Sequence, residues 1–555
     1  MENKELTAAE KLAALRKLME ADGVDHLLVV SDDYHQSEYV GDFFKSRAYI
    51  SGFTGSAGTL VISMDSAKLF ADGRYYIQAE RQIAGSGIDL MRWGTEGVPS
   101  ADEYLVKLVK SGETLAFDGK CVSAKFVDKL KEKLPEGVKL RTDKDYPAEI
   151  WPDRPALPSS EIWPLGLKYA GKSHADKLAD VRKKLDDEKC GSLVMSSLCD
   201  IAWFYNLRGN DVEDTPVFLA YSIVTPEHDY LFTDEKAASE VAPTLAAEKV
   251  ELRPYGEFYD YLPKLTGRVM VDKSAVNSAI ISGLSAAEIV DKQNPTLLMK
   301  AIKNETELEN IRTCHIADRL AVTKLMIELK YGDREFDEVT ADDLLWCLRE
   351  ECADKLGVTL TGKSFGTIAA FGANAAMMHY SADPETAAKI DKTGKNGVPM
   401  LLVDSGGHYL EGTTDITRTF VLGEISDEIR MHYTLTAVGN LRLANLIFLD
   451  GAAGSALDVT CREPLWERGI DYRCGTGHGV GYLLSVHEGP NRFHWKNGDK
   501  KLEAGMITTD EPGVYVEGSH GIRIENELVT EKALHNEYGQ FLKFENITYC
   551  PIDLD

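Results

Sequence analysis

The sequence predicts two α/β domains of one kind followed by a larger α+β domain, and three observations carry this prediction. Five of the 19 prolines fall between Pro147 and Pro164, a density that breaks regular structure and marks a linker. Residues 47–63 and 200–224, on either side of it, share an order of polar, aromatic, turn, glycine and apolar strand residues. Beyond the second copy, two long helical patterns precede short glycine-rich strands. The expected domains are 1–155, 156–298 and 299–555.

In the first domain, apolar residues at helical spacing predict an amphipathic helix over 7–22. A strand is predicted at Asp25–Val30 and a second at Thr59–Ser63. The Lys-rich stretch 125–142 keeps a helical apolar period at Phe126, Leu130 and Leu134. We interpret this stretch as a solvated helix face and not as a basic binding surface.

The pattern restarts after the linker with a predicted helix over Lys172–Lys184 and a strand at Ser192–Met195. The second domain is therefore interpreted as a weakly similar repeat of the first. In the third domain, Glu305–Tyr331 and Asp337–Gly357 are predicted to be helices. Short strands separated by glycine turns dominate from Phe365 onward.

Composition limits the classes of function. The 555 residues are 44% hydrophobic and 27% charged, typical of a soluble globular protein, and the net charge of −27 argues against nucleic acid or an anionic membrane as a partner. Nine scattered cysteines without a CxxC pair suit a reducing compartment. The first residues lack the pattern of a signal peptide, and no run of about 18 apolar residues occurs. We therefore expect a cytoplasmic protein.

Three loop motifs admit alternative interpretations. Gly357–Ser364 fits the phosphate loop GxxxxGK[ST], but such a loop must leave a buried strand and enter a helix. Here a helical pattern precedes it, so we favour a helix exit leading into a strand. Gly362–Gly366 fits a nucleophile elbow but lacks a predicted strand before it. Ser51–Gly58 contains neither Lys nor Arg and is interpreted as a tight turn.

Two pairs of carboxylates flank turns in the third domain. Asp404 and Asp415 lie on either side of a glycine-rich turn, and folding this hairpin can bring both to one point. Glu511 and Glu525 flank a second turn between two strands. Arg523 and Glu527 are expected on the same strand face as Glu525, because side chains alternate with a period of two.

His478 stands between the two pairs, within the glycine-rich segment GTGHGVG. Four carboxylates gathered at strand ends repel one another unless cations neutralise them. Two divalent metals about 3.5–4 Å apart would do so. Oxygen-rich ligation with one imidazole suits Mn²⁺ or Co²⁺, with Zn²⁺ as an alternative. The other interpretation is that these are unrelated surface acids in a chain with 89 Asp and Glu residues.

The chain resembles the long three-domain cytosolic Xaa-Pro aminopeptidases (aminopeptidase P) among the pita-bread metallopeptidases. The resemblance covers almost the whole chain and rests on the segments DDYHQSEYV (32–40), SGFTGSAGT (51–59), DGRYY (72–76), IAWFYNLRGNDVE (201–213), DSGGHYLEGTTDITRT (404–419), GTGHGVG (475–481), VHEGP (486–490), TDEPGVY (509–515) and GIRIENE (521–527). It implies two creatinase N-terminal-like α/β domains and an α+β pita-bread catalytic domain.

The resemblance also implies a site. Five residues would hold two divalent metals: Asp404, Asp415, His478, Glu511 and Glu525, with Asp415 and Glu525 on both ions. Catalytic roles would fall to His379, His487 and Glu511, and substrate contacts to Arg74, His379, His487, Tyr515 and Arg523. One position departs from the family pattern, because Cys474 stands where the family often has His. A thiol cannot supply the same proton near neutral pH without a strong pKa shift.

The implied activity is hydrolysis of the N-terminal Xaa-Pro bond of peptides by a hydroxide held between two metals, with manganese favoured by ligand type, in a homodimer. Three alternatives stay open. The first is a prolidase that cleaves only Xaa-Pro dipeptides. The second is a metal-free pita-bread protein, either creatinase-like or a binding module. The third is a phosphate-loop nucleotidase.

Overall fold

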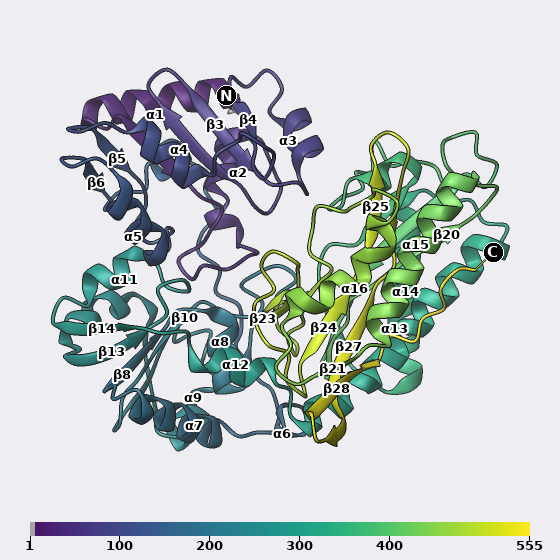
Figure 1. Ribbon diagram of the computed structural model, residues 1–555. Helices are drawn as coiled ribbons and strands as arrows, with labels where there is room; N and C mark the ends of the chain where they lie inside the picture. Colours follow the sequence, from purple (N-terminus) through teal and green to yellow (C-terminus); the bar gives the residue numbers. More distant parts are fainter. Residues whose placement is uncertain (1–5, 555) are drawn as a thin grey trace. The chain divides into compact units, whose positions relative to one another are not determined.

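The computed structural model describes residues 6–554. The chain forms two compact units (Figure 1). The first unit comprises the described residues up to Pro164 together with His174–Glu213 and Val217–Thr296. The second unit comprises Leu165–Ser173, Asp214–Pro216 and the chain from Leu297 onward. The domain boundaries predicted after residues 155 and 298 stay predictions.

The first unit opens with a six-stranded sheet. Its strand order is β4 (Asp89–Arg92), β3 (Ala67–Ala71), β2 (Thr59–Ser63), β1 (His26–Val29), β5 (Thr114–Ala116), β6 (Lys139–Arg141). Its helices are α1 (Ala8–Asp22), α2 (Ser46–Ser51), α3 (Tyr76–Gln82), α4 (Ala101–Leu108) and α5 (Ala124–Lys133), with short 3₁₀ turns η1 (Asp42–Phe44) and η2 (Pro147–Ile150). Thr7 caps α1 in a capping box with Glu10, which explains where the predicted helix begins.

Both faces of this sheet are buried, and alternate residues of one strand serve the two faces. Leu27 of β1 packs in a cluster with Leu12 and Leu15 of α1. Its neighbour Leu28 packs in a second cluster with Leu105 of α4 and Leu130 of α5. The period of two along the strand thus places one helix layer on each side of the sheet.

The second sheet of the first unit has the order β12 (Val250–Pro254), β11 (Asp229–Thr233), β10 (Ala220–Val224), β8 (Ser192–Met195), β13 (Gly267–Val271), β14 (Ala287–Asp291). Its helices are α7 (His174–Asp187), α8 (Leu198–Tyr205), α9 (Ala242–Ala247), α10 (Phe258–Tyr261) and α11 (Ser278–Gly283), with 3₁₀ turns η3 (Tyr255–Glu257) and η4 (Leu262–Lys264) and a short strand pair β7 (Trp163–Pro164) and β9 (Leu207–Arg208).

The two sheets have the same topology. In each sheet the first strand in sequence, β1 or β8, is central. It pairs antiparallel with the first strand of a hairpin, β2–β3 or β10–β11. The second strand of that hairpin pairs parallel with the edge strand, β4 or β12. On its other side, the first strand is followed by two parallel strands. The predicted repeat of one α/β domain is therefore confirmed.

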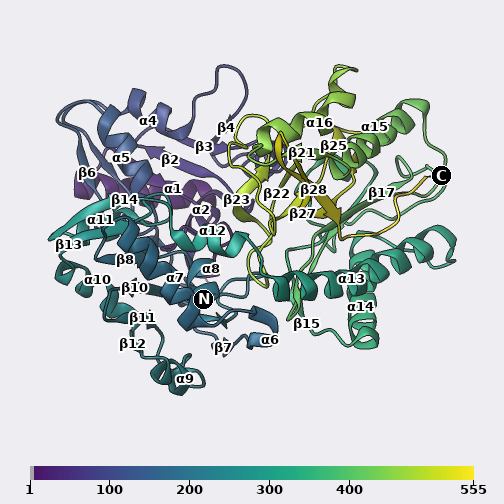
Figure 2. The same ribbon diagram turned by 60° about the horizontal axis from the view of Figure 1, so that its bottom comes forward.

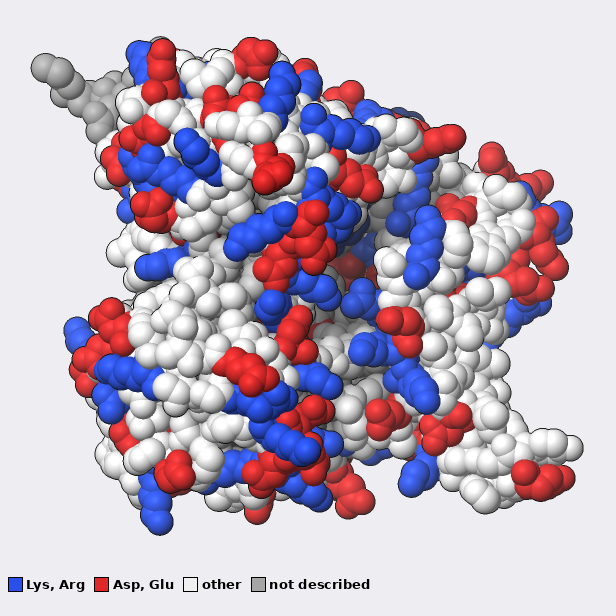
Figure 3. Space-filling model, turned by 60° about the vertical axis from the view of Figure 1, so that its left-hand side comes forward, with Lys and Arg blue, Asp and Glu red and all other residues white. Residues whose placement is uncertain are grey.

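The single helix predicted for residues 125–142 is wrong in its second half. The helix α5 ends at Lys133, and Lys139–Arg141 form the edge strand β6 instead. Pro135 lies just beyond the helix end and cannot continue it. Figure 3 shows Lys and Arg side chains interspersed with Asp and Glu over the face that it presents.

The second unit combines long helices with short strands. The helices are α6 (Leu167–Ala170), α12 (Pro295–Ala301), whose last residues belong to this unit, α13 (Glu305–Tyr331), α14 (Glu338–Leu356), α15 (Asp427–Ala444) and α16 (Gly454–Trp466), with the 3₁₀ turn η5 (Gly372–Ala376). In Figure 2 the strands β17, β27 and β28 of this unit lie between the pair α15–α16 and the pair α13–α14.

The described strands of the second unit form four sheets, one of six strands and three of two or three. Their orders are β15 (Leu360–Lys363), β18 (Gly407–Tyr409), β19 (Gly412–Thr413); β16 (Ile368–Phe371), β17 (Met400–Ser405), β20 (Ile416–Val421); β21 (Ile447–Leu449), β28 (Gly539–Asn546), β27 (Asn526–Asn536), β24 (Ile507–Asp510), β22 (Gly477–Gly479), β23 (Glu488–Phe493); and β25 (Gly513–Val516), β26 (His520–Arg523). Within residues 6–554, no helix combines the length and apolar character that crossing a bilayer needs.

Candidate metal centre

The first carboxylate pair sits where β17 and β20 meet. These strands pair antiparallel with Asp404 opposite Thr417, and Asp415 immediately precedes β20. The turn between them is tight, because a Cβ on Gly406 would lie 1.8 Å from the carbonyl oxygen of Thr414. The hairpin predicted from the sequence therefore forms and brings both carboxylates to one end of the strands.

The second pair comes from the neighbouring strand ends. Glu511 lies between β24 and β25, and Glu525 lies between β26 and β27. The Glu525 amide donates to the carbonyl of Thr417 at 3.1 Å, which joins this pair to the first. Arg523 ends β26 and Glu527 lies on β27, so the chain between them is not one continuous strand. The shared face of Arg523, Glu525 and Glu527 stays a prediction.

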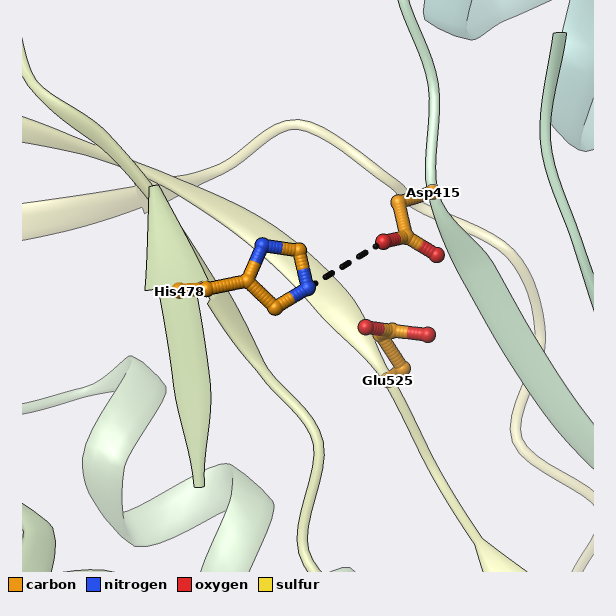
Figure 4. Close-up of side chains that lie close together, drawn as sticks. All are labelled: Asp415, His478 and Glu525. Carbon is orange, nitrogen blue, oxygen red and sulfur yellow. Dashed lines mark ion pairs between the residues drawn. The ribbon is translucent and has the colours of Figure 1, made fainter. Parts of the chain in front are cut away.

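His478 on β22 completes the cluster (Figure 4). Its Nδ1 donates to the carbonyl of Gly479 at 3.0 Å, so Nε2 faces the carboxylates. The Nε2 atom lies 3.5 Å from Asp415 Oδ2 and 3.6 Å from Glu511 Oε1. Ligand atoms of Asp415, His478 and Glu525 all lie within 4.8 Å of one another.

The electrostatics of the cluster favour added positive charge. Burial raises the pKa of Asp404, Glu511 and Glu525, and neighbouring carboxylates, Asp415 among them, raise each pKa further. Burial alone would lower the pKa of His478, but Asp415 and Glu511 outweigh it and raise the pKa to about 9. Added positive charge would therefore favour the ionised forms of Asp404, Glu511 and Glu525.

The donor set fits divalent cations. Asp404 Oδ1 is buried and accepts no hydrogen bond, while its Oδ2 accepts from Arg523 Nη2. One carboxylate oxygen is thus left for a cation, and three further donors converge within metal-binding reach. The orientation of His478 by a backbone carbonyl is the usual arrangement for a metal-ligating imidazole.

The structure places four further residues singled out in the sequence around the cluster. The His487 ring packs edge-on against the His478 ring, with centroids 4.2 Å apart. Arg523 Nη1 donates to the hydroxyl of Tyr515 at 2.8 Å. Cys474 packs with Tyr515 in a small apolar cluster, and burial raises the pKa of its thiol to about 12, so the thiol is neutral at physiological pH.

The structure shows the local packing around His379 and the hydrogen bonds of Arg74. His379 is half-buried and follows η5, which packs tightly on β26: a Cβ on Gly521 would lie 1.8 Å from the Ala375 carbonyl oxygen. Arg74, in the first unit, binds Asp72 through two hydrogen bonds of 2.9 Å. The roles of both side chains stay predictions.

Thr417 is a residue that sequence reasoning missed. Its hydroxyl donates to Glu525 Oε2 at 2.6 Å and accepts from Arg523 Nε at 3.2 Å. It thereby fixes the orientation of a carboxylate and of a guanidinium at once. Its place two residues after Asp415, on the same strand face, is the only signal that the sequence offers.

The alternative loop motifs do not form phosphate or nucleophile sites. Gly357 ends α14 in the left-handed region, with φ of 69°, which confirms the helix exit, but the chain enters β15 within the segment that was expected to be a loop. Lys363 pairs with Asp342 at 2.7 Å, and the buried Ser364 hydroxyl donates to the carbonyl of Thr414. A strand does precede Ser364, contrary to expectation, but another strand and no helix follows it.

Comparisons with known proteins agree along the whole chain. Residues 11–144 and 153–307 each match the Creatinase/Prolidase N-terminal domain, and residues 309–532 match Metallopeptidase family M24. A probable Xaa-Pro aminopeptidase P of Laccaria bicolor is 38% identical over 99% of this chain and 86% of that protein. Aminopeptidase P1 of Lotus japonicus is 34% identical over 97% of this chain and 92% of that protein.

A solved structure supports the same assignment. The X-prolyl aminopeptidase of Caenorhabditis elegans, described as a cytosolic enzyme with a di-nuclear active site, superposes with a TM-score of 0.90 at 30% identity. The match covers 99% of this chain and 92% of that one. The pita-bread fold with two creatinase-type N-terminal domains is thereby confirmed. This chain belongs to the Xaa-Pro aminopeptidase P family of M24 metallopeptidases.

Proposed function

We propose that this protein is a metal-dependent aminopeptidase that releases the N-terminal residue of peptides whose second residue is proline. The observation that carries the proposal is the convergence of Asp415, His478 and Glu525 within 4.8 Å of one another. The membership of the chain in the aminopeptidase P family makes the substrate class specific. An Xaa-Pro bond is a tertiary amide without an N–H, so general peptidases handle it poorly.

Two divalent cations are the proposed cofactors, with Mn²⁺ preferred and Co²⁺ or Zn²⁺ as alternatives. The di-nuclear site described for the C. elegans neighbour supports this number. The proposed holders are Asp404, Asp415, His478, Glu511 and Glu525. Asp415 and Glu525, whose ligand oxygens lie within 4.8 Å of each other, would contact both ions.

In the proposed mechanism, bound cations would supply a nucleophile at neutral pH and polarise the scissile carbonyl. Glu511 would take up a proton at its carboxylate and return it to the proline nitrogen as the bond breaks. Its raised pKa, caused by burial and by neighbouring carboxylates, suits a group that carries a proton. His487 and His379 would donate hydrogen bonds to the carbonyl oxygen as its negative charge develops.

Arg523 and Tyr515 would line the substrate site. Arg523 is held by Asp404, Thr417 and Tyr515, which fixes the plane of its guanidinium before substrate arrives. Cys474 would contribute an apolar wall here, because its half-buried, neutral thiol cannot replace the charge of an imidazole.

The test is hydrolysis of an Xaa-Pro-Yaa tripeptide by purified protein with its metal content measured. Chelation should abolish hydrolysis, and added Mn²⁺ should restore it. Full activity of a metal-stripped sample would contradict the proposal. Cleavage of Xaa-Pro dipeptides with no cleavage of tripeptides would favour the prolidase instead.

Two further proposals rest on the family. A cytoplasmic location agrees with the cytosolic description of the C. elegans enzyme and can be tested by fractionation. A homodimer is proposed from the resemblance alone. Light scattering that returns the 61.4 kDa of one chain at micromolar concentration would refute it.

A further inference from the structure

A buried charge cluster lies beside the candidate centre. Glu488 begins β23, and its Oε1 lies 2.7 Å from Lys303 Nζ while its Oε2 lies 3.2 Å from Lys300 Nζ. The three side chains are only 1–4% exposed. Charges this deeply buried are costly to desolvate, so each ammonium depends on the carboxylate between them.

The two lysines belong to the segment that enters the second unit. The chain passes from the first unit to the second between Thr296 and Leu297, inside α12. Lys303 also donates its amide to the carbonyl of Gly505 at 3.0 Å, and Ile302 bridges to Met506 just before β24. The connector residues 297–303 therefore bond to β23 through a carboxylate and to the start of β24 through the backbone.

Glu488 is also close in the fold to His478 and His487. It pairs in register with Gly479, the residue after His478. A Cβ on Gly481 would lie 3.2 Å from Glu488 Oε2 and 2.6 Å from the Ser485 carbonyl oxygen, so the loop closes tightly over the carboxylate. The residue before Glu488 is His487, whose ring packs on His478.

We propose that Glu488, held between Lys300 and Lys303, is a positioning residue that fixes the His487 imidazole against His478. The inference rests on the proposed function, because His487 is given there its contact with the substrate carbonyl. The carboxylate touches no substrate atom; it acts by holding the short segment that carries the histidine. The connector residues 297–303 would then help to hold His487 in place, in addition to linking the two units.

The variants Glu488→Gln and Lys303→Met test this proposal by a double-mutant cycle with His487→Ala. Each single variant should lower kcat/KM for an Xaa-Pro-Yaa peptide by about 10–100-fold, the range found for groups that orient active-site residues. Neither should lower it further in the His487→Ala background. Metal content should match wild type, because the five proposed ligands are untouched.

A second readout does not depend on activity. Carbethoxylation of His487 by diethyl pyrocarbonate, followed by peptide mass spectrometry, should be several-fold faster in Glu488→Gln than in wild type. Modification of the exposed His535 serves as the internal reference. If wild type hydrolyses no Xaa-Pro peptide, the proposed function fails, and this rate alone decides whether Glu488 positions His487.

Lys330→Met is the matched control, because Lys330 pairs with Asp553 at the same 2.7 Å in the same unit. It should lower the melting temperature without changing kcat/KM or the His487 rate. Additive losses in the double variants, or an unchanged His487 rate, would overturn the proposal. If Glu488→Gln does not fold, the cycle and the His487 rate measured with Lys303→Met decide the question.

Discussion

At the scale of single residues, the candidate centre behaves as one electrostatic unit. Asp404 and Glu525 are buried and Glu511 is half-buried, and neighbouring carboxylates raise the pKa of each. Arg523 opposes this for all three carboxyls. One guanidinium cannot balance them, so loss of any one carboxylate changes the charge that the others meet.

The first prediction follows from this balance. Asp415→Ala and Glu525→Ala should each remove almost all peptidase activity, because each would serve both metals. The fold should survive, since removing a carboxylate relieves repulsion. Steady-state kinetics, metal analysis and circular dichroism melts would measure the three effects together.

Glu545→Gln is the control for these two variants. Glu545 pairs with Arg312 on the surface of the same unit and should be replaceable without loss of activity. Retention of more than about a tenth of wild-type activity in either ligand variant, beyond the ~10-fold loss typical of outer partners, would argue against a role on both metals.

The residues that could be predicted are those whose chemistry is unusual in their local sequence. Four acids and a histidine beside glycine turns pointed to metal binding, and the structure gathers them. Thr417 and Glu488 could not be predicted in the same way. Thr417 acts on Glu525, 108 positions away, and Glu488 acts on Lys303, 185 positions away. Only the fold makes those pairs.

At the scale of elements, residues 357–364 connect a helix to a strand. Gly357 accepts the left-handed conformation that ends α14, and Lys363 on β15 pairs with Asp342 of α14. A phosphate loop needs its amides at the start of a helix, and β16 follows here instead.

The second prediction is therefore that Lys363→Ala leaves peptidase activity near wild type. A half-exposed ion pair contributes little to stability, so the melting temperature should change only slightly. Calorimetry should detect no ATP binding to wild type. Tight ATP binding that disappears in Lys363→Ala would restore the nucleotide interpretation.

A contact between the helix α15 and the strand β26 should make the stability of the fold depend on pH. His432 of α15 and His520 of β26 are buried, with Nδ1 and Nε2 3.1 Å apart and rings stacked. Burial lowers the pKa of both imidazoles, and His432 lowers that of His520 further, while Glu428 opposes these effects without reversing them. The hydrogen bond between the two rings needs one neutral ring as its acceptor.

The third prediction follows from the lowered pKa values of His432 and His520. In the unfolded chain both residues titrate near pH 6.5, whereas in the folded protein they take up protons only at lower pH. As the pH falls below about 6.5, the unfolded chain binds more protons and the free energy of unfolding decreases. Each kcal/mol lost should lower the melting temperature by about 2–4 °C.

His520→Asn should reduce this acid sensitivity, because an amide can hydrogen-bond without titrating. His535→Asn, on the exposed part of β27, is the control and should keep the wild-type slope. Melts between a neutral and a mildly acidic buffer would compare the three proteins. Equal slopes for wild type and His520→Asn would assign the acid loss to other groups.

The elements that could be predicted well carry their own boundary signals. The helix Glu305–Tyr331 begins at the capping box of Asn304 and Glu307. The helix Glu338–Leu356 lies between the cap Asp337 and Gly357. The strands β15 and β6 were missed because both are short and their sequences are polar. They exist through pairing with β18 and β5, which no local pattern reveals.

At the scale of the whole molecule, a repeated pair of sheets accompanies a unit that holds the candidate centre. The repeat could be inferred because both copies keep the same order of turn, glycine and strand. Their common topology could not, since the parallel edge strands are short. Both copies match the Creatinase/Prolidase N-terminal domain. Substitution of charged residues in the first unit can therefore test what this unit contributes to peptidase activity.

Arg74 is the residue of the first unit for which the resemblance implies a substrate contact. Its Nε and Nη2 are bound by Asp72, and its guanidinium lies over Tyr75, 5.2 Å from the ring centroid. Nη1 lies 4.0 Å from Glu38 Oε1, beyond hydrogen-bond distance. The group is thus pre-oriented with one edge able to bond a peptide carbonyl or terminal carboxylate.

The fourth prediction is that Arg74→Ala raises KM for Xaa-Pro-Yaa peptides and leaves Xaa-Pro dipeptides less affected. A charge-assisted hydrogen bond contributes about 1.5–3 kcal/mol, which corresponds to a loss of roughly ten- to hundredfold in kcat/KM. Arg92→Ala is the matched control, because Arg92 also combines an acidic partner, Glu80, with a ring, Tyr76. Steady-state kinetics on one tripeptide and its parent dipeptide would measure the difference. Equal values for Arg74→Ala and wild type on the tripeptide would place Arg74 outside the substrate site. Arg74 is expected to distinguish tripeptides from dipeptides only through a hydrogen bond to the residue that follows the proline.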